Sequence, residues 1–260
     1  MPMIDADACP IHVQVDGPER GPVLMLCNSL GTTLHMWDDQ VEPFARRFRL
    51  VRYDRRGHGR SGAPNGPYTI DRLGKDALAV MDALGVDKVN WCGLSLGGMV
   101  GMWLGAHAPA RLDRLILSNT ACYMPGGGLW DQRIKAVREG GMAALADGIL
   151  ERWFTPKFRE RAPGVMARMR EMVLSTPPAG YAACCEAIRD MDQRESIRTI
   201  SAPTLIIAGR HDPATNLEAA EFMLARIPGA SLKVLDAAHI SNVEQPRDYA
   251  ETVLGFLKPA

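Results

Sequence analysis

The sequence has no excess of either charge and no long apolar run. Its 260 residues include 30 lysines and arginines against 30 aspartates and glutamates. Zero net charge argues against nucleic acid or an anionic membrane as the main partner, although a local arginine could still hold a small anion. The longest apolar stretches, 23–27 and 204–208, are as short as strands, whereas a membrane-spanning helix needs about 20 apolar residues. We therefore expect no nucleic-acid partner and no membrane partner.

The sequence also lacks the patterns of secreted and metal-binding proteins. The start of the chain has neither the basic nor the apolar segment of a secretory signal. None of the six cysteines belongs to a CxxC pair, and the adjacent Cys184 and Cys185 suit neither an ordinary disulfide nor a zinc site. We expect reduced, buried thiols, no metal site and a cytoplasmic location.

Short apolar runs alternate with longer helical patterns along most of the chain. This alternation is typical of an α/β protein with a mostly parallel central sheet flanked by helices. The expected strands are 11–15, 23–27, 49–53, 89–93, 112–117, 204–208 and 232–235. The expected helices are 36–47, 69–84, 96–107, 217–226 and 246–257.

The segment 121–198 differs from the rest of the chain. It contains several helical patterns and no convincing strand, and it opens at the glycine-rich stretch after Pro125. We expect a helical cap inserted between two core strands, with 1–120 and 199–260 forming the core. Such an insertion would lie over the carboxyl ends of the strands, where ligands bind in open α/β sheets.

The sharpest signal is the pentapeptide Gly93-Leu94-Ser95-Leu96-Gly97. An apolar run precedes it and a helical pattern follows it, which is the strand–turn–helix context of a nucleophile elbow. Glycine at 93 and 97 removes side chains that would collide across so tight a turn. Ser95 is therefore the candidate nucleophile. The amide of Leu96, at the start of the helix, can face a developing oxyanion.

A serine hydroxyl is a poor nucleophile unless a base activates it. One known order along the chain is serine, then acid, then histidine, with the last two in loops after late strands. Asp212 follows the apolar run 204–208, and His239 follows the run 232–235. Asp212 would then fix the tautomer of His239, which would take the proton of Ser95.

Nearby residues offer alternatives for the base, the acid and the second oxyanion donor. His211 could be the base in place of His239, and Asp236 could be the acid or could cap the histidine loop. A second oxyanion donor usually comes from the loop after an early strand, and the amide of Leu30 is the candidate. The side chains of Asn28 and Ser29 could instead order that loop.

Together these residues resemble the α/β-hydrolase superfamily over essentially the whole chain. The likeness consists of 28–31, 54–61, 93–97, 209–212 and His239. Most members carry His-Gly where this chain has Asn-Ser, and the stretch Asn-Ser-Leu-Gly-Thr resembles the 3-oxoadipate enol-lactonases of bacterial aromatic catabolism. Further likeness to that family lies in 53–61, 93–98, 129–134 and 151–156.

The resemblance implies an α/β-hydrolase fold and a defined reaction. The substrate would be the anionic 3-oxoadipate enol-lactone, opened to 3-oxoadipate through a serine acyl-enzyme in protocatechuate and catechol catabolism. Ser95, Asp212 and His239 would carry the chemistry, with the Leu30 and Leu96 amides holding the oxyanion. No metal or organic cofactor would be needed.

The free carboxylate of that substrate requires a cation or strong hydrogen-bond donors. Arg133 in the cap is the candidate, and the competing interpretation is a solvated surface charge. Trp130, Trp153 and Ser29 are the further candidates for contact with the substrate, and for the tryptophans plain packing is the competing interpretation.

Other functions share the same catalytic pattern. A related carboxylesterase, a C–C bond hydrolase of ring-cleavage products and a cofactor-free perhydrolase would differ only in the pocket. A non-catalytic ligand receptor of the same fold is the remote alternative. Ser95 argues against haloalkane dehalogenases and epoxide hydrolases, which use a carboxylate nucleophile. The sequence leaves homo-oligomer formation open, since apolar residues on the cap could pair two chains.

Overall fold

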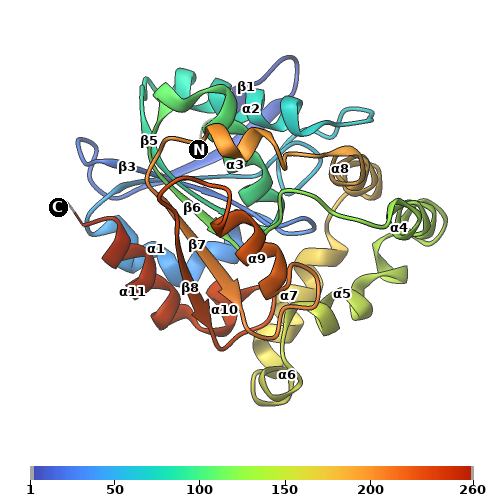
Figure 1. Cartoon of the computed structure of the whole chain (residues 1–260). Coiled ribbons are helices and arrows are strands. Elements are labelled where there is room, and N and C mark those ends of the chain that lie inside the picture. The colour runs from blue at the N-terminus through green and yellow to red at the C-terminus, as the bar shows by residue number, and fades with distance from the viewer. Residues whose placement is uncertain (1–2, 259–260) are drawn as a thin grey trace.

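The computed structural model describes residues 3–258, and an eight-stranded sheet forms its centre (Figure 1). The strand order is β1-β2-β4-β3-β5-β6-β7-β8. The pairs β1–β2 and β2–β4 are antiparallel and every other pair is parallel, which confirms the mostly parallel sheet predicted from the sequence. The strands are β1 (Met3–Asp5), β2 (Pro10–Asp16), β3 (Val23–Cys27), β4 (Arg49–Tyr53), β5 (Val89–Leu94), β6 (Leu112–Ser118), β7 (Thr204–Gly209) and β8 (Ser231–Leu235).

Helices cover both faces of this sheet. Helix α3 packs on β5 and β6 and against α2, while α1 packs against α11, which contacts β8 (Figure 1). The core helices are η1 (Leu34–Trp37), α1 (Asp38–Ala45), α2 (Ile70–Ala83), α3 (Leu96–His107), η2 (Pro109–Arg111), α9 (Leu217–Leu224), α10 (Ser241–Glu244) and α11 (Pro246–Phe256). Within residues 3–258, no helix is both long enough and apolar enough to cross a membrane.

Short elements account for the differences from the sequence prediction. Strand β1 and helix α10 were not expected, because elements of three and four residues bury too few side chains to show a periodic pattern. The expected helix 36–47 begins instead with the 3₁₀ turn η1, whose N-cap Thr33 accepts a hydrogen bond from the amide of His35. Helix α3 has the bounds that were predicted.

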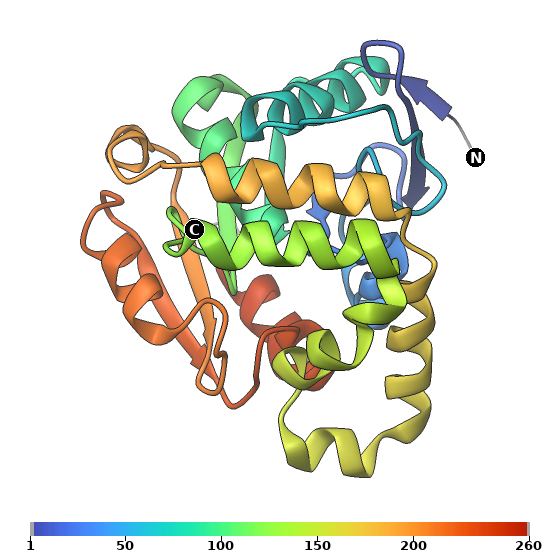
Figure 2. The same ribbon diagram turned by 90° about the vertical axis from the view of Figure 1, so that its right-hand side faces the viewer.

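The segment 121–198, which we call the cap, joins β6 to β7. Helices α4 and α8 pack side by side over one end of the sheet, and α5, α6 and α7 extend beyond them (Figure 2). The cap helices are α4 (Gly127–Gly140), η3 (Met142–Ala144), α5 (Ala146–Trp153), α6 (Pro156–Arg161), α7 (Pro163–Leu174), α8 (Pro178–Asp190) and η4 (Ser196–Thr199). Helices α6, α7 and α8 each begin with a proline, whose missing N–H costs nothing at that position.

Two glycines bring the cap into backbone contact with the core. Gly57 follows β4 and has a φ of +75°, and a side chain on it would place Cβ 2.7 Å from Cα of Gly180 in α8. A Cβ on Gly180 would in turn collide with the carbonyl oxygen of Gly57. Helix α8 therefore rests directly on the core at this point.

Candidate active site

Ser95 stands on a strained turn between β5 and α3. Its φ of 57° and ψ of −116° are rare for a residue other than glycine. A Cβ on Gly93 would collide with the carbonyl oxygen of Gly97, and a Cβ on Gly97 would collide with that of Cys27. The local geometry is therefore the nucleophile elbow that the glycine spacing predicts, and Leu96 is the first residue of α3.

Asp212 and His239 lie side by side in the loops after β7 and β8. Oδ2 of Asp212 accepts a hydrogen bond from Nδ1 of His239 at 2.8 Å, and both residues are buried. The alternative pair, His211 and Asp236, forms its own exposed contact at 2.8 Å. The structure thus brings together the acid and base expected from the chain order, and it places the two alternatives elsewhere.

The carboxylate of Asp212 is held at both oxygens. Oδ1 accepts from the amides of Ala214 and Thr215 at 2.8 and 3.0 Å, and Oδ2 accepts from Oγ1 of Thr215 at 2.7 Å. Burial by itself raises the pKa of Asp212, but the charge of His239 and these hydrogen bonds outweigh it and lower the pKa to about 2. Asp212 is therefore ionised at neutral pH and can act as the hydrogen-bond acceptor for His239.

Asn119 joins the acid loop to the histidine loop. Its Nδ2 donates to Oδ2 of Asp212 and to the carbonyl oxygen of Ala238, each at 3.1 Å. Its Oδ1 accepts from Oγ of Ser241 at 2.6 Å. It follows β6 with a φ of 43°, in the left-handed region that asparagine tolerates better than most residues. One buried side chain therefore fixes the residues on both sides of His239 relative to the acid.

Ser95 and His239 line one small cavity of about 50 Å³, which we call the inner cavity. In the part of the chain that the structure describes, the Ser95 hydroxyl makes no hydrogen bond with His239 or any other group. Serine–histidine contacts of this kind commonly tighten only when the substrate is bound. The hydroxyl is therefore free to face a ligand.

The two predicted oxyanion donors are available. Within residues 3–258, the amides of Leu30 and Leu96 donate to no other protein group, and Leu30 lines the inner cavity. The adjacent amide of Gly31 donates to Nε2 of His58 at 2.9 Å. Burial, with the nearby charge of Arg55, lowers the pKa of His58 to about 3. The imidazole is therefore neutral and can accept that bond.

Asn28 orders the loop, which is one of the alternatives considered for it. Its Nδ2 donates to the carbonyl oxygen of Tyr53, and its Oδ1 accepts from Nε1 of Trp37, each at 2.9 Å. Ser29 instead lines the inner cavity, and its amide donates to Sδ of Met36 at 3.3 Å. Asn28 therefore ties this loop to the core.

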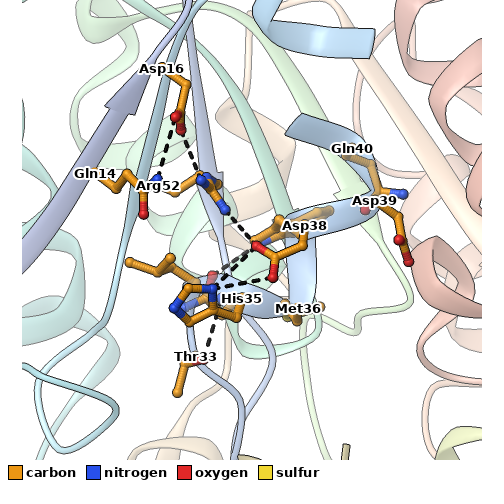
Figure 3. A network of polar contacts seen from close by, with 12 residues as sticks. Gln14, Asp16, Thr33, His35, Met36, Asp38, Asp39, Gln40 and Arg52 are labelled. Atoms are coloured by element: carbon orange, nitrogen blue, oxygen red, sulfur yellow. Dashed lines mark hydrogen bonds and ion pairs between the residues drawn. The ribbon is translucent and has the colours of Figure 1, made fainter. Parts of the chain in front are cut away.

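The segment after this loop is fastened to the sheet by charged residues. Figure 3 shows Arg52 between Asp16 and Asp38, with donor–acceptor distances of 2.8 and 2.9 Å. Asp38 also contacts Nδ1 of His35 at 3.2 Å. Met36, whose sulfur accepts the Ser29 amide, lies in the same turn as His35 (Figure 3).

The cap side of the inner cavity is formed by aromatic and cationic residues. The guanidinium of Arg133 lies 5.5 Å from the ring centroid of Trp130 and 5.4 Å from that of Tyr181. Arg133, Trp130 and Trp153, the candidates for contact with the substrate, all line the cavity, and so does Arg152. Among residues 3–258, no carboxylate forms an ion pair with either arginine. Partial burial lowers the pKa of Arg152 from its usual value, and the charge of Arg133 lowers it further.

A second, larger space of about 820 Å³ adjoins the first, and we call it the outer cavity. Five residues line both cavities: Met124, Trp130, Arg133, Arg152 and Ala214. The inner and outer cavities therefore adjoin at a junction where the two arginines stand.

Comparison with known proteins identifies the family. A model of the α/β hydrolase fold matches residues 22–246. The chain belongs to the α/β hydrolases. It is 40% identical over 242 residues to 3-oxoadipate enol-lactonase 2 of Acinetobacter baylyi, covering 93% of this chain and 91% of that protein. The enol-lactonase from Burkholderia xenovorans LB400 is 42% identical, with a TM-score of 0.97 over 98% of this chain and 99% of that one.

A hydrolase from Pseudomonas aeruginosa PA01 is 45% identical to this α/β hydrolase, with a TM-score of 0.96 over 99% of this chain and 97% of that one. These similarities extend over nearly the full length of the chain. The protein is therefore an enzyme, a carboxylic ester hydrolase.

Sequence reasoning on this α/β hydrolase missed two residues of the site. Arg152 stands next to Trp153 in a stretch already noted for its family likeness, but nothing in the sequence tells which cap arginine faces the cavity. Asn119 could have been suspected, because it is a polar residue directly after a buried, apolar strand. That position is where α/β proteins gather their functional side chains.

Proposed function

We propose that this α/β hydrolase opens 3-oxoadipate enol-lactone to 3-oxoadipate in the catabolism of aromatic compounds. One observation carries the proposal: Arg133 and Arg152, which have no carboxylate partner within residues 3–258, line the cavity that also holds Ser95 and His239. The lactone has one free carboxylate, and guanidinium groups bind carboxylates with paired hydrogen bonds. The enol-lactonases of similar sequence support this choice among anionic esters.

In the proposed reaction Ser95 attacks the lactone carbonyl while His239 takes its proton. The oxyanion is held by the free amides of Leu30 and Leu96. The bond between the carbonyl carbon and the ring oxygen then breaks, and His239 returns the proton to the enol oxygen, after which the enol becomes the ketone. Water, activated by His239, finally releases the acid from Ser95.

The size of the inner cavity supports a position for the substrate carboxylate at the two arginines. About 50 Å³ is far below the ~300–1,000 Å³ of ordinary ligand sites, so the ring and its arm extend toward the outer cavity. The two arginines stand at that junction. The carboxymethyl arm therefore meets Arg133 and Arg152 when the carbonyl is at Ser95.

The test is an ultraviolet assay of lactone disappearance, run beside a neutral aryl ester. We expect kcat/KM for the lactone to approach ~10⁶ M⁻¹s⁻¹, within the range of well-matched enzymes, with the ester slower by several decades. Ser95→Ala should lower kcat by at least ~10⁴-fold at an unchanged melting temperature. An inert lactone beside a favoured ester would refute the proposed substrate, and a near-normal rate in Ser95→Ala would remove Ser95 from the mechanism.

A further inference from the structure

The outer cavity is much larger than the proposed lactone requires. Its volume of about 820 Å³ falls within the ~300–1,000 Å³ typical of sites for drug-sized ligands, whereas the lactone is one five-membered ring with a short arm. The cavity lies between cap helix α4 and core helix α9, since Leu129 and Ala136 line it from one side and Ala219 and Phe222 from the other. The enzyme therefore has room for a much longer ligand.

The lining of this cavity is mainly apolar. Leu129 exposes 70% of its surface, and Phe222 lies on the opposite helix. A third cation, Arg194, lines the cavity, but it is paired with Asp192 at 2.5 Å and stacks on Tyr123 at 4.2 Å. Within residues 3–258, the outer cavity thus offers a mainly apolar surface, and its only cations without a carboxylate partner are the two arginines that it shares with the inner cavity.

A ligand that spans both cavities meets three environments in order. Ser95 and His239 come first, Arg133 and Arg152 stand at the junction, and the apolar surface of α4 and α9 comes last. This arrangement suits an ester with two different arms on its carbonyl: a short acyl arm whose carboxylate stops at the arginines, and an apolar alkoxy arm that continues past them into the outer cavity.

We infer that the enzyme also hydrolyses half-esters of short dicarboxylic acids whose alcohol is an apolar chain. The inference rests on the proposed function, because it uses the same serine chemistry and the same two arginines. The ester carbonyl lies at Ser95, the free carboxylate lies at Arg133 and Arg152, and the alkoxy chain lies in the outer cavity between Leu129 and Phe222.

The reaction balances as an ester hydrolysis. Oγ of Ser95 bonds to the carbonyl carbon, the bond from that carbon to the alkoxy oxygen breaks, and His239 gives the leaving alcohol the proton it took from Ser95. Water then adds to the acyl carbon, its proton passes through His239 to Oγ of Ser95, and the acyl bond breaks. One ester and one water yield the dicarboxylate, the alcohol and one proton, and nothing is oxidised or reduced.

The test follows proton release from monoalkyl succinates, from methyl to hexyl, with the corresponding alkyl butanoates as neutral esters. Burying each methylene should raise kcat/KM roughly twofold to fourfold, so the hexyl succinate should exceed the methyl succinate at least ~30-fold. The hexyl succinate should also exceed hexyl butanoate about tenfold. The lactone is assayed in parallel on the same preparation.

Two variants fill the outer cavity from opposite sides. Ala219→Trp on α9 and Ala136→Trp on α4 should each reduce the advantage of the hexyl over the methyl ester at least about fivefold, since bulk there displaces the chain. The matched control is Glu221→Trp, which adds the same bulk to an exposed position of α9 that lines neither cavity. It should leave the chain-length dependence unchanged.

The outcomes separate the two claims. Lactone turnover without any rise along the succinate series overturns the inference and leaves the proposed function standing. A rise that survives both tryptophan variants also overturns it, because the chain then lies elsewhere. Equal rates on succinates and butanoates also overturn the inference, because the carboxylate then gains nothing from Arg133 and Arg152. Loss of lactone turnover as well overturns both claims together.

Discussion

The inner cavity has two walls whose polar groups are paired differently. We call them the core wall, with Asp212, His239 and Asn119, and the cap wall, with Arg133 and Arg152. On the core wall, the carboxylate of Asp212 accepts hydrogen bonds at both oxygens, and Asn119 ties that carboxylate to the histidine loop. On the cap wall, within the described residues, Arg133 and Arg152 face the ligand space without a carboxylate, and Arg133 is held by aromatic rings. The Asp212–His239 pair of the core wall is held by hydrogen bonds within the protein, whereas the arginines of the cap wall have no anionic partner among the described residues.

Under the proposed function, this difference separates the groups that react from the groups that recognise the substrate. Groups that must transfer a proton with fixed geometry are locked by neighbours, which is how active sites hold their reacting groups. Groups that must attract an anion are left unneutralised, since a paired arginine would offer the substrate little. Substitutions that remove the hydrogen bonds or charges of one wall at a time test this difference, and the largest effect is expected at Asp212.

Asp212→Asn breaks the core wall at its centre. We expect kcat to fall about 10⁴-fold, because the asparagine no longer fixes the tautomer of His239 or stabilises its charged form. The matched control is Asp236→Asn, whose carboxylate is exposed and paired with His211, and which should change kcat less than twofold. Steady-state kinetics on the lactone would check both, and a larger loss in the control would move the acid to Asp236.

Arg133→Gln and Arg152→Gln break the cap wall. Each should lower kcat/KM for the anionic lactone about 10- to 100-fold, because a charged hydrogen bond to the carboxylate is lost. A neutral aryl ester should lose less than about threefold. Arg194→Gln is the control, since that guanidinium already pairs with Asp192 and should matter little. Equal losses on both substrates would show that these arginines do not read the carboxylate.

Substitutions of Asn119 test how much the hydrogen bonds of the core wall contribute to kcat. Asn119→Gly and Asn119→Ala both remove the hydrogen bonds to Asp212 and Ala238, and we expect kcat to fall about tenfold with KM almost unchanged. Glycine accepts the φ of 43° without strain, and alanine does not. Equal kcat in the two variants assigns the loss to the side chain. Normal kcat in the glycine variant would mean that only the backbone conformation counts.

The smallest effect is expected at His58, and it concerns the free energy of unfolding. Its folded pKa of about 3 lies below the usual value of 6.5, so the unfolded chain binds the extra proton first as the pH falls. Stability is therefore lost between pH 6.5 and 3, by about 2 kcal/mol from pH 6.5 to 5. His58→Gln cannot titrate and should flatten this slope in urea unfolding at pH 7 and 5. An unchanged slope would assign the pH dependence to other groups.

Apart from Asn119, the core wall could be predicted from the sequence, and the cap wall could be predicted only in part. Ser95, Asp212 and His239 carry their own signals, since glycines flank the first and the other two follow apolar strands in a known order. The mostly parallel sheet follows from the same apolar runs. These features are local or depend only on chain order, so one sequence is enough to read them.

The remaining features depend on packing between distant segments. Which arginine of the cap faces the cavity is decided by how α4 and α5 rotate against the core, and no local pattern records that rotation. The 3₁₀ turn η1 and the one-turn helix α10 are likewise stabilised by contacts across the fold, such as that of Asn242 with the carbonyl of Met36 at 2.8 Å. Because the sequence does not record how α5 rotates against the core, Arg152 was missed.

The contact between Gly57 and Gly180 sets which part of the cap can be reshaped. Two backbones meet there without side chains between them, so a single methyl group at position 180 would push α8 away from the core. Helix α8 carries Tyr181, which packs against both Gly31, in the loop after β3, and Arg133. Redesign for new substrates therefore has a fixed side at α8 and an adjustable side at α4, and libraries are best confined to the latter.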